Sequence, residues 1–263
     1  MTGRQLARVS AIHYHETIWS DVFAGNRHTV SCLQPAVLAA ESALALAPQR
    51  RGRVVWRLDG GAGSDEQVQW LLGRGYQVIA KGMSNRRAEA LTRQVARWDP
   101  YQDAWLGRVE PPLDYARPVQ VWVKRRLKEG QYRHSYYLTS LTFPSKAAMM
   151  ACYDQRGGAE VEQFRNDKNG LHLAARRKRL LAAQSGLVLL TDLAHNLLAD
   201  FHHRALVGSP FESFGPKRIV RDLLAIPGRV VFDGSQVKRI DLLASHPHAD
   251  EMLICLERYC SGD

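Results

Sequence analysis

The sequence predicts an α/β fold, and three observations support this prediction. The stretch V-V-W-R-L-D, which ends at Asp59, has the β-branched and apolar residues of a short strand. A helical pattern over 65–72 follows it, and Y-Q-V-I-A-K-G over 76–82 indicates a second strand. The order strand, helix, strand is typical of a parallel sheet, and the glycines directly after Asp59 suit the intervening turn.

Composition bounds the class of protein. The chain has 263 residues, which is enough for one large domain or two small ones. Apolar residues make up 45% and charged residues 24%, as in an ordinary soluble protein. The net charge of +10 and the isoelectric point of about 9.7 favour a polyanionic partner. Nucleic acid is the first candidate, although ribosomal and membrane-surface proteins share this trait.

The cysteines and the apolar runs indicate the cellular compartment in which the protein is expected. Four cysteines are scattered without a C-x-x-C pair, which argues against a zinc site and for a reducing environment. No apolar run approaches the roughly 18 residues of a membrane span. The first ten residues lack the apolar core of a signal peptide. We therefore expect a cytoplasmic protein that makes no membrane contact.

The first half of the chain alternates strands and helices. Residues 8–24 are expected to form a hairpin that the Gly25-Asn26 turn closes, and apolar spacing predicts a helix over 28–46. A further helix is expected over 84–97, followed by irregular chain as far as 116. Asp59 itself has two interpretations: a functional carboxylate at the carboxyl end of a strand, or an Asx-turn that caps the next helix.

A β-hairpin is predicted over 117–142. Two strands of period two flank the turn at 128–131. Their basic residues, with tyrosines nearby, suit either a phosphate backbone or a solvated strand face. The basic residues in question are Lys124, Arg125, Arg126 and Lys128.

The second half is mainly helical. A helix starts near Ser145, and a second one is expected after Gly157-Gly158, with Glu160 at or near its first turn. Residues 186–207 are predicted to form a buried helix, and a short basic helix, a hairpin at Asp233-Gly234 and a last helix follow. A basic run on the second helix fits a DNA-facing surface or a solvated one. The run comprises Arg176, Arg177, Lys178 and Arg179, and Arg165 and Lys168 precede it on the same helix.

Three stretches carry a family resemblance. Tyr153, Arg156 and Glu160 form a Tyr-x2-Arg-x3-Glu pattern, R-L-D-G-G-A-G-S-D-E surrounds Asp59, and the tail begins with L-L-T-D-L-A-H-N-L-L. Together they resemble the DDE-class insertion-sequence transposases, which have a ribonuclease-H-like core and a Tyr-Arg-Glu-Lys signature helix. The resemblance covers nearly the whole chain and implies a ribonuclease-H-like mixed sheet with flanking helices, a β-rich insertion and a mainly helical C-terminal tail.

Two departures from the family pattern affect the site. Seven residues separate Glu160 from Lys168 where the family has six, and counting from Glu162 gives five. At roughly 100° per residue, Glu160 and Lys168 are about 80° apart around the helix. The Tyr and Arg spacings favour Glu160 over Glu162. The family's first catalytic Asp has no counterpart here, so we expect an N-terminally truncated transposase.

The resemblance also implies a chemistry and its partners. Asp59 and Glu160 would bind Mg²⁺, which Mn²⁺ can replace, for cleavage and strand transfer at the ends of an insertion sequence. Arg156 and Lys168 would hold DNA phosphates, and Tyr153 would position the strand. The partners are the terminal inverted repeats and target DNA in a bacterial nucleoid, with a homodimer as the working form. The implied divisions are 1–108 (partial core), 109–144 (insertion), 145–185 (signature helix) and 186–263 (tail).

A second class of function stays open. Without the first Asp, one metal ion loses a principal ligand, and we expect weak or no cleavage by this chain alone. The chain would then be a non-catalytic DNA-binding remnant or a subunit of a transposase. Metal-dependent cleavage, as opposed to salt-sensitive binding alone, separates the two hypotheses.

Overall fold

The computed structural model describes residues 3–28, 30–173, 175 and 178–261, and it leaves the side chains of residues 156–163 undescribed. The chain forms two compact units. Unit 1 comprises Met1–Ala7 and Phe23–Gly158, and unit 2 comprises Arg8–Val22 and Ala159–Asp263. A two-stranded sheet, made of β1 (Arg4–Ala11) and β2 (Glu16–Ala24), has residues in both units, as does the long helix α4 (Lys146–Gly170).

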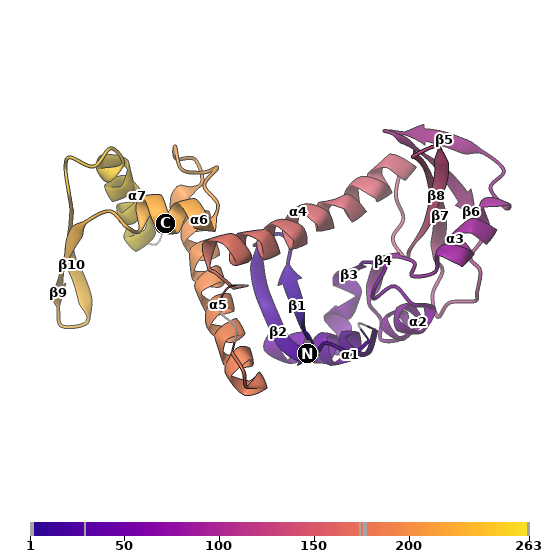
Figure 1. Ribbon diagram of the computed structural model, residues 1–263, viewed down its shortest axis with the longest axis horizontal. Coiled ribbons are helices and arrows are strands. Elements are labelled where there is room, and N and C mark those ends of the chain that lie inside the picture. Colours follow the sequence, from indigo (N-terminus) through magenta and orange to yellow (C-terminus); the bar gives the residue numbers. More distant parts are fainter. Residues whose placement is uncertain (1–2, 29, 174, 176–177, 262–263) are drawn as a thin grey trace. The chain divides into compact units, whose positions relative to one another are not determined.

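Unit 1 contains a six-stranded mixed sheet with flanking helices (Figure 1), so the predicted α/β class is confirmed. The strand order is β3-β4-β8-β7-β6-β5. Only β3 and β4 pair in parallel, through Val55 with Gln77 to Leu58 with Ala80, and every other neighbouring pair is antiparallel. The strands are β3 (Val55–Leu58), β4 (Gln77–Lys81), β5 (Trp98–Tyr101), β6 (Ala104–Val109), β7 (Gln120–Lys128) and β8 (Gln131–Thr139).

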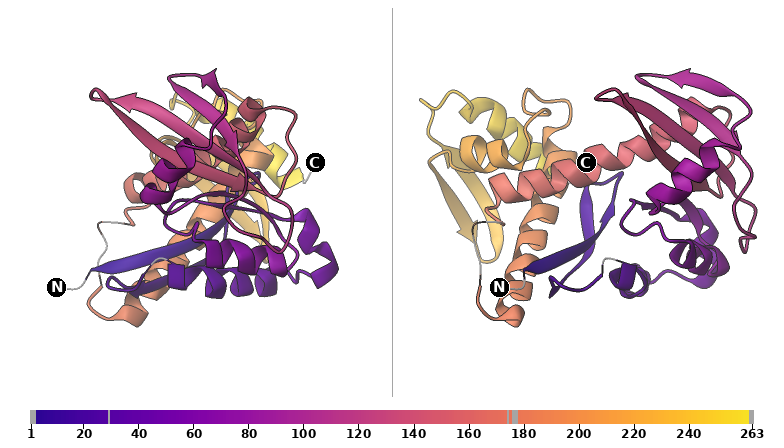
Figure 2. Two further views of the ribbon diagram at one scale, coloured as in Figure 1. Left: turned by 90° about the vertical axis from the view of Figure 1, so that its right-hand side faces the viewer. Right: turned by 45° about the vertical axis from the view of Figure 1, so that its right-hand side comes forward.

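The region 84–116 differs from the sequence prediction. The expected helix over 84–97 is shorter, since α3 spans Asn85–Thr92, and the chain that follows is not irregular because it forms β5 and β6. Pro100 lies within β5, opposite Trp105 of β6. Proline is tolerated there because β5 is the edge strand and needs no further ladder hydrogen bond. The predicted hairpin over 117–142 is confirmed as β7 and β8 (Figure 2).

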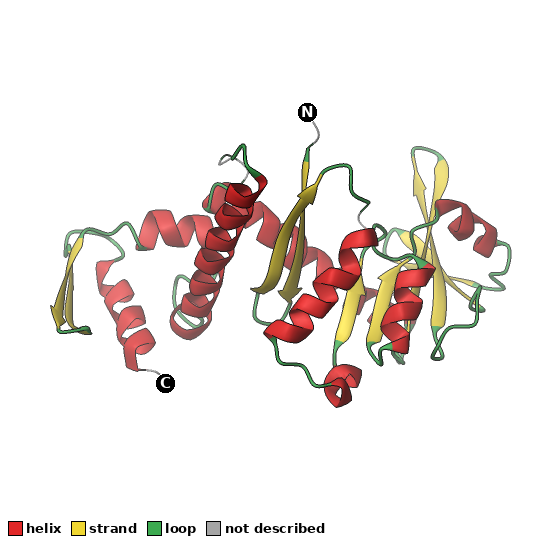
Figure 3. Cartoon of the chain, turned by 90° about the horizontal axis from the view of Figure 1, so that it is seen from below, coloured by secondary structure: helices red, strands yellow, loops and turns green. Residues whose placement is uncertain are grey.

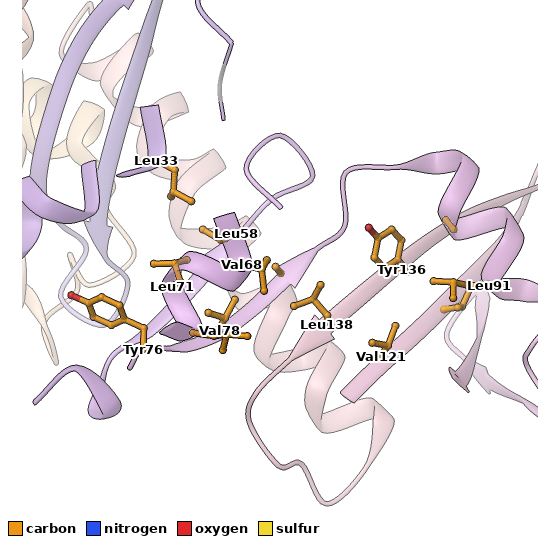
Figure 4. Close-up of a cluster of buried hydrophobic side chains, with 14 of the residues drawn as sticks. Leu33, Leu58, Val68, Leu71, Tyr76, Val78, Leu91, Val121, Tyr136 and Leu138 are labelled. Carbon is orange, nitrogen blue, oxygen red and sulfur yellow. The ribbon is translucent and has the colours of Figure 1, made fainter. Parts of the chain in front are cut away.

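Both faces of the sheet in unit 1 are covered. Successive strand residues point to opposite faces, so Val78 and Ala80 face one apolar cluster while Ile79 faces another. The first cluster includes residues of α1 (Val30–Ala43), α2 (Asp65–Gly73) and α3 (Figures 3 and 4). The second cluster lies against the first part of α4. Its buried members are Ile79, Leu106, Trp122, Tyr137, Met149, Met150 and Tyr153.

Unit 2 has its own core. Its centre is the end of α5 (Leu181–Phe201) with the π-helical turn that follows it, packed against α7 (Ala249–Ser261). The predicted hairpin at Asp233-Gly234 is confirmed as a two-stranded sheet. The remaining elements are the π-helical turns His202–Leu206 and Ile219–Leu223, α6 (Pro216–Arg218), β9 (Gly228–Asp233) and β10 (Gln236–Leu242).

Two helix predictions need correction. The expected break at Gly157-Gly158 is wrong, because α4 continues through both glycines, and Glu160 therefore lies in mid-helix rather than in a first turn. Each glycine costs a helix about 1 kcal/mol relative to alanine, a preference that tertiary contacts can override. The helix over 186–207 is buried on one side only, since Leu190 and Leu197 are 66% and 58% exposed. In the described part of the chain, no helix is long and apolar enough to cross a membrane.

A glycine substitution tests the packing of the sheet in unit 1. A Cβ at Gly82 would lie 1.9 Å from the ring of Tyr136, which is buried, so Gly82→Ala should destabilise the fold by about 1–3 kcal/mol. Gly73→Ala is the matched control, because nothing lies within 4 Å of a Cβ there and alanine favours the helix. Urea unfolding of the two variants checks this, and equal midpoints would contradict the packing described.

Candidate functional site

Asp59 lies directly after β3, in an exposed turn at the carboxyl end of the parallel pair. Its Oδ1 accepts hydrogen bonds from the backbone N–H groups of Gly61 at 2.9 Å and Ala62 at 3.2 Å. This is the Asx-turn that the sequence allowed, although Ser64 and not Asp59 caps the next helix. Among the residues that the structure describes, Asp59 Oδ2 has no partner. The carboxylate therefore keeps one oxygen free while the other holds the turn.

The glycine turn lies against the end of β4, and Gly63 is the position there that requires glycine. A Cβ at Gly63 would fall 1.9 Å from the carbonyl oxygen of Lys81, whereas a Cβ at Gly60 would make an ordinary contact with the Lys81 side chain at 3.8 Å. Only glycine leaves room for such a close approach of two backbones. The aliphatic part of Lys81 thus passes beside Gly60, and a cationic residue borders the turn that carries Asp59.

The first part of α4 is attached to the strand that carries Asp59. Arg57, two residues before Asp59, donates from Nη1 to Oε1 of Gln155 at 3.4 Å. On the same helix, the ring of Tyr153 packs edge-on against Tyr137 of β8, with 4.8 Å between the ring centroids. Tyr153 is 5% exposed, so its ring lies in the core of unit 1. A stacking contact between this ring and DNA would require it to leave that core.

The other residues of the predicted site are only partly visible. The side chains of Arg156 and Glu160 lie outside the described residues, as do Arg176 and Arg177 altogether. Three other predicted DNA-binding residues lie in unit 2 and are exposed, so their charged groups are accessible to a phosphate. They are Arg165, Lys168 and Lys178.

The donor atoms of Asp59 fit a divalent ion in part. A carboxylate oxygen is a hard ligand of the kind that Mg²⁺ prefers, and Asp59 Oδ2 provides one. Within the described residues, no group of three or more His, Cys, Asp or Glu side chains is placed to hold a metal ion. Asp59 thus supplies one ligand, and the described residues around it do not complete a coordination shell.

A polar cluster near the start of α2 was not foreseen from the sequence. Asp65, at the start of α2, forms an ion pair with Arg87 of α3 and accepts a hydrogen bond from Tyr115 Oη at 2.9 Å. Burial and the hydrogen bond to Asp65 raise the pKa of Tyr115, and burial also raises the pKa of Tyr136 nearby. Both phenols stay protonated and do not act as bases: Tyr115 donates a hydrogen bond to Asp65, whereas the oxygen of Tyr136 accepts one from Arg87.

The far end of the sheet in unit 1 carries an aromatic–basic face, which comprises Trp98, Trp105, Arg125, Tyr132 and His134. The Arg125 guanidinium lies 4.3 Å from the ring centroid of Trp98, 5.3 Å from that of Trp105 and 5.2 Å from that of Tyr132. Trp105, Arg125 and His134 are cross-strand partners on β6, β7 and β8, so they share one face. Tyr132 is 50% exposed. Aromatic and basic side chains gathered on a sheet suit stacking with nucleobases.

Comparison with known proteins gives no match. No model of a protein family matches the chain, and no curated protein matches it either. The likeness to DDE transposases therefore rests on the three sequence stretches described above, and the function that it implies is a proposal.

Proposed function

We propose that this protein acts on DNA by metal-dependent phosphoryl transfer, as a DDE transposase does, with Asp59 and Glu160 as metal-binding carboxylates. The observation that carries the proposal is the contact between Arg57 and Gln155. It joins the strand that ends at Asp59 to the helix that holds the signature residues. Arg57 and Gln155 are 98 positions apart in the sequence, so this hydrogen bond links β3 to α4 across a long separation.

The roles of the residues follow from their chemistry. The free oxygen of Asp59 is a ligand that the Asx-turn holds in place, because the other oxygen is fixed by two backbone N–H groups. A bound Mg²⁺ or Mn²⁺ would supply Lewis-acid stabilisation and a nucleophilic water or hydroxyl. Lys168 and Arg165 are exposed on the same helix as Glu160, where they would hold phosphate oxygens, and Arg156 is proposed to do the same.

A second candidate function is non-catalytic DNA binding, and the aromatic–basic face favours it. Stacking of unpaired bases on Trp105 and Tyr132 needs no metal ion and no carboxylate. The guanidinium carbon of Arg125 lies 5.3 and 5.2 Å from the centroids of these two rings, so a positive charge adjoins the rings on which bases would stack. Both functions require DNA, and they differ in whether a strand is broken.

Isosteric removal of the carboxylate charge tests the catalytic proposal. Asp59→Asn keeps an oxygen that can accept the two backbone hydrogen bonds, so the turn should persist while metal binding is lost. We expect weak cleavage of DNA that carries the element's ends, dependent on Mg²⁺ or Mn²⁺. Both Asp59→Asn and Glu160→Gln should reduce it by about 100-fold or more, equivalent to ~2.7 kcal/mol of barrier.

Asp233→Asn, in the exposed turn of the β9–β10 hairpin, is the control for loss of a surface carboxylate. Cleavage that survives in the Asp59 or Glu160 variant would rule out that residue as a metal ligand. DNA binding without cleavage by the parent chain in either metal would favour the second function.

A matched pair of substitutions tests the aromatic–basic face. Tyr132 and Leu127 are cross-strand partners at the end of the β7–β8 hairpin, 50% and 51% exposed. Tyr132→Ala should weaken the binding of a short single strand by roughly 5- to 100-fold, because base–aromatic stacking is worth ~1–3 kcal/mol. Leu127→Ala removes a similar exposed apolar side chain without a ring and should leave the Kd unchanged. Fluorescence anisotropy with labelled DNA measures both, and equal losses would show that stacking is not involved.

A further inference from the structure

Four charged side chains form a buried cluster in unit 2: Arg8 on β1, Asp167 on α4, and Asp192 and His195 on α5. Arg8 Nη1 lies 2.5 Å from Asp167 Oδ2, and Arg8 Nη2 forms a second ion pair with Asp192. His195 Nδ1 lies 2.7 Å from the other oxygen of Asp167. Asp167 is 0% exposed and His195 is 4% exposed. The cluster therefore holds its charges away from water.

The geometry determines the protonation state of His195. Its Nε2 lies 2.7 Å from the backbone carbonyl oxygen of His15, and its Nδ1 faces the Asp167 carboxylate. The carbonyl oxygen accepts, and the Asp167 carboxylate, which accepts from Arg8 Nη1 with one oxygen, faces His195 with the other, so both ring nitrogens donate. His195 is then an imidazolium, and the cluster has two positive and two negative charges. A neutral ring would direct a lone pair at one of these oxygens.

The pKa of His195 agrees with this state. Burial lowers the pKa, but the hydrogen bond and the charge of Asp167, with the carbonyl of His15, outweigh burial and raise it above the ordinary 6.5. Burial also raises the pKa of Asp192, against the charge of Arg8. A cavity of about 250 Å³ adjoins His195, and the other titratable side chains that line this cavity are Tyr14, His15, His202, His203 and Glu212.

The cluster attaches α4 to other elements of unit 2. Arg8 contacts α4 twice, through Asp167 and through the ring of Phe164, whose centroid is 4.9 Å from the guanidinium carbon. The hairpin and α5 are joined separately, because the Asn196 amide exchanges hydrogen bonds of 2.8 and 2.9 Å with the backbone of Thr17. The end of α4 also packs closely against Lys217 at Gly170, but Asp167 is the buried charged contact that connects the helix to both β1 and α5.

Position 160 lies on the same side of α4 as Asp167. It precedes Asp167 by seven residues, which is about two turns at roughly 3.6 residues per turn. Any rotation of α4 that moves Asp167 also moves position 160 by the same angle.

We propose that Asp167 is a positioning residue, held between Arg8 and a doubly protonated His195, that fixes α4 and with it Glu160, and that loss of the His195 proton releases the helix. The role of Glu160 rests on the proposed function, whereas the attachment of α4 through Asp167 does not. Because the folded pKa of His195 is raised, its contribution to stability is complete below about pH 6.5. That contribution disappears as the pH rises through the folded value.

Nitrogen-15 NMR of the histidine rings in the unaltered chain, recorded as a pH series, tests the protonation state directly. His195 should keep protons on both nitrogens to a higher pH than an ordinary histidine does. In Asp167→Asn the side chain keeps its shape but not its charge, and His195 should lose its second proton at a lower pH than in the unaltered chain. His203→Gln is the control, since His203 is exposed beside the same cavity and its loss should leave the His195 titration unchanged. A His195 that becomes neutral at or below the pH of an ordinary histidine in the unaltered chain would overturn the proposal.

Hydrogen exchange tests the hold on the helix. After correction for intrinsic rates, the protection of the amides of residues 164–168 should fall at least tenfold as His195 loses its proton. The His195→Gln variant should show the low value at every pH. Protection that does not follow the titration would overturn the proposal, and the pH series on the unaltered chain decides this even if a variant fails to fold.

Cleavage assays separate the two proposals. If strand cleavage occurs, the activity of the parent should fall as His195 loses its proton, and Asp167→Asn should show this fall at a lower pH while DNA affinity is unchanged. A pH profile that is the same in both proteins would rule out the positioning role. If no variant or parent cleaves DNA while the NMR and exchange results hold, the proposed function fails and the hold on α4 stands.

Discussion

The long helix α4 is held by two different kinds of interaction, and much of the structure depends on them. In unit 1, Met149, Met150 and Tyr153 pack into an apolar cluster on one face of the sheet. In unit 2, Asp167 is held by buried charge. Apolar packing fixes the distance between a helix and the surface it covers but allows small rotations about the helix axis. Paired charges with fixed hydrogen-bond directions specify one orientation of the helix. A buried ion pair is costly to desolvate and contributes little net stability, so its value here lies in the specificity of that orientation.

The sequence predicted the elements whose signal is local. The pairing of β3 with β4, the hairpin of β7 and β8, and α2 each follow from a short pattern with a clear turn. The failures had two physical causes. Pro100 concealed β5, because its place at the edge of the sheet depends on pairing with β6 and not on its own composition. The glycine pair at 157 and 158 suggested a break in α4, because propensity ignores the contacts that each half of the helix makes.

The predictions for the site succeeded where the signal was local and failed where it depended on distant residues. Asp59 was predicted correctly to follow a strand, and the Asx-turn allowed for it is present, because both depend on the adjacent sequence. The buried position of Tyr153 was not predicted, since Tyr137 lies on a distant strand. The charge cluster was missed because Arg8 is 159 positions from Asp167 and 184 from Asp192. One signal was available: Asp192 and His195 interrupt an apolar helix, and buried charges of this kind require partners.

Net charge alone gives a poor account of how this protein would meet DNA. On the β7–β8 hairpin and its surroundings, Lys124 lies over Tyr101, Arg125 lies among three rings, and Arg126 is paired with Asp103. Lys128 and Arg133 are the cations of this hairpin without a partner among the described residues. Five free cations would give log Kd a salt slope of magnitude about 3.5–4.5, whereas two give about 1.4–1.8. If the chain binds DNA through this hairpin as proposed, a salt slope near the lower value would show that the partnered cations do not release counterions and that stacking on exposed rings provides much of the affinity.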